Sequence, residues 1–79
     1  MFFKRIKELR LEHHLTQAAA AQKLSINREV YRRYETGIRD IPVDILIQMA
    51  RGYRTTTDYI LGLSEDRYVN GYTNAASGR

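Results

Sequence analysis

The chain has 79 residues, 43% of them hydrophobic, which suffices for one small core but excludes two domains around a buried substrate cavity. It contains no cysteine, so disulfides and thiolate metal sites are excluded. The opening residues become charged at Lys4 and no apolar run could span a membrane. We therefore expect a soluble cytoplasmic protein without a signal peptide.

Positive charge is concentrated in the first half of the chain. The formal net charge is +4, with 13 Lys and Arg against 9 Asp and Glu. Residues 1–40 carry the whole excess, whereas residues 41–79 are neutral. Such asymmetry is typical of a face that binds a polyanion, and double-stranded DNA is the leading candidate. A solvated charged surface is the alternative.

The first half predicts three helices. Over residues 2–13, apolar residues recur at helical spacing between charged ones. Thr16 is a suitable N-cap for an alanine-rich helix that ends near Leu24. Asn27 is a second N-cap, for a helix that runs to Thr36.

The second half predicts two more helices. Pro42 fits the first turn of a helix with a core-facing apolar stripe, and Ile45 falls outside that stripe. The residues of the stripe are Val43, Leu46, Ile47, Ala50 and Tyr53. Thr56 is the N-cap of a last short helix, which Gly62 closes. The fold class is therefore all-α, a bundle of five helices.

A polar tail, residues 64–79, follows the helical domain of residues 1–63. Asn70-Gly71 lies between short β-favouring runs, which predicts a hairpin in this tail. A frayed polar terminus is the alternative. We expect the tail to contribute to dimerisation.

The turn between the second and third predicted helices spans residues 24–27 (LSIN). A connection this short joins two helices at a steep angle, as in a helix-turn-helix, whose second helix enters the DNA major groove. The segments RIKELR, LTQ, QKL, RYETG, IPVDILIQMA and TTDYILGLS resemble, in this order, the Cro/phage-repressor type of helix-turn-helix domain, the xenobiotic-response-element (XRE) family. The resemblance covers about residues 3–64 and implies a lambda-repressor-like, DNA-binding bundle.

The third predicted helix is then the recognition helix. Its base-reading candidates share one face, and they are Arg28, Glu29, Arg32 and Arg33. The other face carries Tyr31 and Tyr34, which we expect in the core. In the resembling family, residues matching Arg28, Glu29 and Arg33 read base edges or neighbouring phosphates. An arginine side chain can donate to the edge of guanine, and a glutamate can accept from cytosine N4. A solvated face with Glu29–Arg33 pairing is the alternative.

Groups that flank the recognition helix are the candidates for phosphate contacts. They are Thr16, Gln17, Thr36, Gly37 and Arg39. Gln17 lies at a helix start, where free backbone N–H groups favour an anion. The family's matching glutamine binds backbone phosphate and braces the recognition helix, whereas an ordinary first-turn glutamine is the alternative.

The resemblance also implies a partly buried ion pair between Arg10 and Glu35, with a structural role. Two independent surface charges are the alternative. His13 and His14 are adjacent and point apart on a helix, so no metal site is expected. No nucleophile elbow or phosphate-binding glycine loop is present, so we expect no enzyme, cofactor or small-molecule substrate.

The resulting hypothesis is a sequence-specific transcriptional regulator, a repressor that binds a two-fold operator as a homodimer. One alternative is the antitoxin of a toxin–antitoxin pair, with a toxin as protein partner. Another is an interaction module of the same fold without DNA binding. We expect self-association through the last two helices and the tail, aided by the apolar surface of Leu11, Ile45, Tyr68 and Tyr72.

Overall fold

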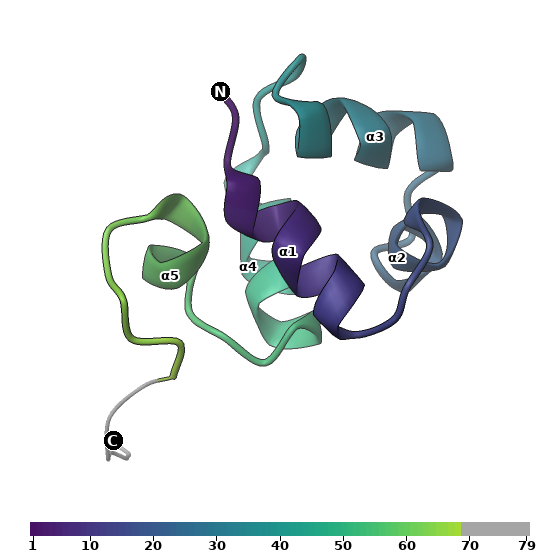
Figure 1. Ribbon diagram of the computed structural model, residues 1–79. Helices are drawn as coiled ribbons and strands as arrows, with labels where there is room; N and C mark the ends of the chain where they lie inside the picture. The colour runs from purple at the N-terminus through teal and green to yellow at the C-terminus, as the bar shows by residue number, and fades with distance from the viewer. Residues whose placement is uncertain (69–79) are drawn as a thin grey trace.

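Five short helices follow one another in the computed structural model, which describes residues 1–68 (Figure 1). They are α1 (Lys4–Glu12), α2 (Gln17–Lys23), α3 (Arg28–Thr36), α4 (Val43–Gly52) and α5 (Thr57–Leu61). No strand occurs in this part of the chain, so the predicted all-α class is confirmed. The predicted hairpin at Asn70-Gly71 lies outside the described residues.

Side-chain caps start three of the helices. Thr16, Asn27 and Thr56 each accept a hydrogen bond from the backbone N–H three residues later, at 2.8 to 3.0 Å. Such a cap contributes about 0.5–2 kcal/mol. At the other ends of α3 and α5, Gly37 and Gly62 adopt the left-handed conformation, with φ of 82° and 80°. The predicted helix boundaries at Thr16, Asn27, Thr56 and Gly62 are confirmed.

Three helices end on a left-handed residue that is not glycine. His14, Ser25 and Arg54 have φ between 56° and 58°. In each case the next N–H bonds to a carbonyl five residues earlier, as Ile26 does to Ala21 at 3.1 Å. This is the Schellman arrangement, and a side chain in it costs about 1 kcal/mol relative to glycine.

One core joins all five helices. Contacts are most extensive between α2 and α3, and α1 contacts both α3 and α5 (Figure 1). The buried apolar residues are Ile6, Leu9, Ala20, Ala21, Leu24, Tyr31, Tyr34, Ile45, Met49, Ala50, Tyr53 and Ile60. No helix among residues 1–68 has both the length and the apolarity needed to cross a membrane.

The predicted core stripe of α4 is wrong in part. Ile45 is buried at 9% exposure, whereas Val43 and Ile47 are 71% and 39% exposed. Met49, absent from the prediction, is 1% exposed, and Leu46 is partly buried. The segment VDILI is apolar on more than one side, so two stripes fit its period equally well. Packing against the other helices selects the one that contains Ile45 and Met49.

Candidate nucleic-acid interface

The α2–turn–α3 unit is built from a tight, hydrogen-bonded connection. The N–H of Ser25 donates to Gln22 and that of Ile26 to Ala21, both at 3.1 Å, so the last carbonyls of α2 are satisfied. Asn27 then caps the next helix through a 2.8 Å bond to Val30. Because these bonds fix the turn, α3 is held at a defined angle to α2.

The two sides of α3 differ sharply in exposure. Tyr31 and Tyr34 point into the core with 0% and 4% exposure, as predicted. The four base-reading candidates lie together on the outward side, where Arg28, Glu29 and Arg33 are exposed and Arg32 is partly exposed. The helix therefore presents three guanidinium groups and one carboxylate on a single solvent-facing surface.

Glu29 is paired within this outward face. Its two carboxylate oxygens accept from Arg32 Nε at 3.1 Å and Arg32 Nη2 at 2.6 Å, and Arg33 Nε lies 3.3 Å from Oε2. The Arg32 hydrogen bonds, assisted by Arg33, lower the pKa of Glu29 to about 2. Glu29 is therefore charged at any physiological pH.

Two of the phosphate candidates lie at the start of α2. Thr16 Oγ1 accepts from Ala19, so its own hydroxyl proton remains free to be donated. The side-chain amide of Gln17 donates to Glu35 Oε1 at 3.0 Å, which ties α2 to α3. Since an amide carries two N–H groups, Gln17 keeps one donor beyond this bond.

The other three phosphate candidates lie at the end of α3 and just after it. The hydroxyl of Thr36 donates to the Arg32 carbonyl at 2.8 Å, and the N–H of Gly37 donates to Tyr34 at 3.3 Å. Both groups thus use their protons inside the protein. Arg39 is exposed, with its guanidinium 6.0 Å from the centre of the Tyr34 ring.

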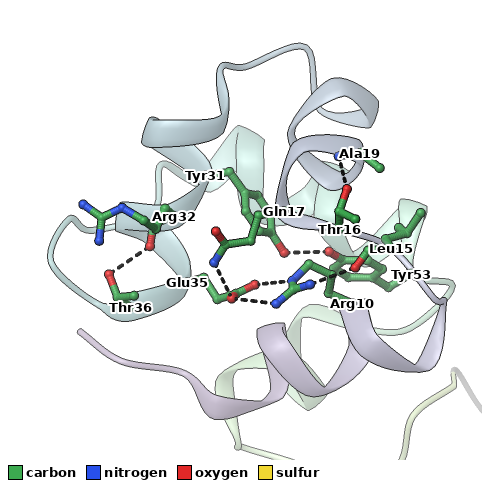
Figure 2. A network of polar contacts seen from close by, with 10 residues as sticks. All are labelled: Arg10, Leu15, Thr16, Gln17, Ala19, Tyr31, Arg32, Glu35, Thr36 and Tyr53. Carbon is green, nitrogen blue, oxygen red and sulfur yellow. Dashed lines mark hydrogen bonds and ion pairs between the residues drawn. The ribbon is translucent and has the colours of Figure 1, made fainter.

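A buried ion pair between Arg10 and Glu35 joins α1 to the inner side of α3 (Figure 2). Arg10 donates to both oxygens of Glu35, at 2.8 and 3.1 Å, and to the carbonyl of Leu15 at 2.8 Å. The two side chains are 9% and 3% exposed. Burial alone would raise the pKa of Glu35, but hydrogen bonds from Arg10 and Gln17 outweigh it and hold the pKa below its ordinary value.

The sequence did not reveal a second buried polar contact beside this pair. The hydroxyls of Tyr31 and Tyr53 lie 2.7 Å apart and link α3 to the end of α4 (Figure 2). Burial raises the pKa of both tyrosines, so both are neutral. The sequence placed both tyrosines at core positions, and this could have indicated the contact, because a buried hydroxyl requires a hydrogen-bond partner.

Some of the positive charge is used inside the fold. The Arg5 guanidinium donates to the carbonyls of Tyr59 and Ser64, at 2.8 and 2.7 Å, and lies 4.1 Å from the Tyr59 ring centre. Arg67 bonds both oxygens of Glu12 at 2.6 Å. These contacts hold the segment after α5 against α1, so the charges of Arg5 and Arg67 are used within the fold.

The histidines do not assemble a metal site in the described part of the chain. His13 stacks on Tyr53, with ring centres 5.4 Å apart, and His14 sits in the turn after α1. Among residues 1–68, no three side chains of metal-binding type come together.

The helix-turn-helix geometry agrees with the comparison to known families. The family model described as "Helix-turn-helix" (HTH_3) matches residues 6–60. The chain belongs to this family of Cro and phage-repressor type.

The relatives are regulators from Bacillus subtilis (strain 168). "Uncharacterized HTH-type transcriptional regulator YobD" is 39% identical over 66 residues, which is 84% of this chain and 59% of that protein. "HTH-type transcriptional regulator ImmR" is 40% identical over 62 residues, 78% of this chain and 49% of ImmR. The chain therefore spans about half the length of the curated relatives it matches. No solved structure matches at a significant level.

Proposed function

We propose that this chain is a sequence-specific DNA-binding transcriptional regulator. The observation that carries the proposal is the outward face of α3, which presents Arg28, Arg32 and Arg33 from a helix held rigidly by its buried side. A helix of this kind fits the major groove, and guanidinium groups suit both guanine edges and phosphates. The B. subtilis relatives named as transcriptional regulators support the same function.

The residues divide into two roles. Arg28, Glu29, Arg32 and Arg33 read bases, since they project from the recognition helix. Thr16, Gln17, Thr36, Gly37 and Arg39 contact phosphates, since they flank it. Thr16, Gln17 and Arg39 keep free donors in the structure, so they carry most of this second role. Thr36 and Gly37 must rearrange to donate to a phosphate.

The regulator acts as a homodimer that represses by covering a promoter. Two-fold symmetry places two recognition helices in half-sites about 10 bp apart. The dimer surface is formed by exposed apolar residues of α4 and of the chain after α5, namely Val43, Ile47, Leu63 and Tyr68. Leu11, 53% exposed as predicted, lies on α1 and adds exposed apolar area, whereas Ile45 is buried and cannot contribute. Tyr72, also predicted to contribute, lies outside the described residues.

The proposal is tested by titrating a random-sequence duplex at several salt concentrations. We expect the logarithm of the affinity to fall linearly with the logarithm of salt, because phosphate contacts release counterions. Selection from a random duplex library should then yield a two-fold consensus, and sedimentation should show a dimer at micromolar concentration. A chain that binds no duplex would instead be an interaction module of the same fold. An antitoxin would keep the salt dependence and also bind a toxin.

A further inference from the structure

Glu29 is the one exposed carboxylate within α2 and α3. The only other acid of these two helices, Glu35, is buried against Arg10. Glu29 is therefore the one carboxylate beside Arg28, Arg32 and Arg33 on the outward face of α3, which faces DNA under the proposed function.

The carboxylate occupies donors that a phosphate would use. Arg32 presents Nε and Nη2 to the two oxygens of Glu29 as a fork, and Arg33 adds a third donor. A guanidinium binds carboxylate and phosphate in the same bidentate geometry. A phosphate can take this edge of Arg32 only after Glu29 has been displaced.

A displaced Glu29 has two possible surroundings. Against an arbitrary duplex it faces phosphates and base acceptors, and repulsion opposes the complex. Against a base pair that presents an amino group in the major groove, such as cytosine N4, it regains a donor.

We propose that Glu29 is a specificity-determining residue: on an arbitrary duplex it competes with DNA phosphate for Arg32 and Arg33, the arginines that read bases at the selected site. The inference rests on the proposed function and assigns Glu29 a role in rejecting arbitrary sequence. Displacing the carboxylate from Arg32 and Arg33 lowers the affinity for DNA. A base that donates a hydrogen bond to Glu29 offsets this loss, and other bases do not. Specificity then arises from a cost to wrong sites as well as from contacts to the right one.

The test compares Glu29→Gln with Glu8→Gln in the full chain. Glu8 is exposed on α1 and has no ion pair within residues 1–68, so its substitution makes the same change in net charge away from α3. The probes are a random-sequence duplex and a duplex selected by the wild-type protein. Thermal melting followed by circular dichroism verifies that both variants are folded.

We expect Glu29→Gln to bind the random duplex more tightly, with a steeper salt slope. One further phosphate contact makes the slope of log affinity against log salt steeper by about 0.9. Between 1 M and 0.1 M salt, this difference corresponds to an additional gain in affinity of about eightfold. The selected duplex should gain less or lose affinity, so the ratio between the two duplexes falls. Equal changes in Glu29→Gln and Glu8→Gln, or equal gains on both duplexes, would overturn the inference. Absence of any duplex binding by the wild-type protein would instead overturn the proposed function, and the inference with it.

Discussion

Two glutamates of α3 make ion pairs with arginine, one on each side of the helix. Glu35 meets Arg10 at 2.8 Å with 3% of its side chain exposed, and Glu29 meets Arg32 at 2.6 Å with 51% exposed. The two distances are similar, but the pairs differ in their exposure to water, and this difference gives them different roles. Water can replace the partner of Glu29 and cannot replace that of Glu35. The buried pair therefore holds the helix in place, whereas the exposed pair can be exchanged for a ligand.

The largest expected effect comes from breaking the buried pair. Glu35→Ala leaves the Arg10 guanidinium buried without its partner and removes the bond from Gln17. We expect a loss of about 3–5 kcal/mol in the free energy of unfolding, measured with urea. Replacing both members, by Arg10→Met with Glu35→Leu, should recover most of that loss. A single variant as stable as the wild type would contradict the assignment.

The Arg10–Glu35 pair also predicts how the free energy of unfolding depends on pH. Glu35 has a folded pKa below its ordinary value of 4.5. Its stabilisation is therefore complete above the pKa of the unfolded chain and is lost as pH falls through the folded pKa. Stability measured from neutral to acid pH should decline less in Glu35→Gln than in the wild type.

On the outward side, Arg33→Ala should weaken binding to the selected duplex by about 1–3 kcal/mol and relax one position of the half-site. Arg39→Ala is the comparison, because Arg39 follows the helix and is proposed to contact phosphates alone. Under the proposed function it should weaken all duplexes alike and reduce the salt slope by about one. Fluorescence anisotropy with selected and random duplexes separates the two. If Arg33→Ala weakened both duplexes equally, Arg33 would be a phosphate contact.

The tyrosine pair extends the buried side of α3 to α4. Tyr53→Phe removes one hydroxyl of the 2.7 Å contact and leaves that of Tyr31 with one fewer partner. We expect a loss of about 1–2 kcal/mol in unfolding free energy, because an unsatisfied buried hydroxyl retains its desolvation cost. Tyr34→Phe is the matched control, since no side-chain hydrogen bond of Tyr34 occurs within residues 1–68. Equal losses would show that the hydroxyl contact between Tyr31 and Tyr53 contributes no specific stability.

The smallest expected effect completes the contrast between the two glutamates. Glu29→Gln should change the unfolding free energy by less than about 0.5 kcal/mol, because exposed ion pairs on helices contribute little. Urea unfolding measures it beside Glu35→Ala. A loss comparable with that of Glu35→Ala would mean that the outward pair also supports the fold and is not exchangeable.

Local sequence patterns predicted the helices and the residues of the candidate interface. Thr16, Asn27 and Thr56 mark helix starts because each bonds a backbone N–H three residues away, which is a local interaction. The outward arginines and inward tyrosines of α3 follow from helical spacing alone, as does the Glu29–Arg33 contact left open as an alternative.

The buried side of α4 and the polar contacts across the core depend on how the helices pack. Ile45 and Val43 are both apolar, so helical spacing does not choose between them; contact with the other helices does. The partners of Tyr53 and Arg5 are 22 to 60 residues away in the chain. Such contacts depend on the angles at which helices pack, and these angles are set by the shapes of many side chains together rather than by any local pattern.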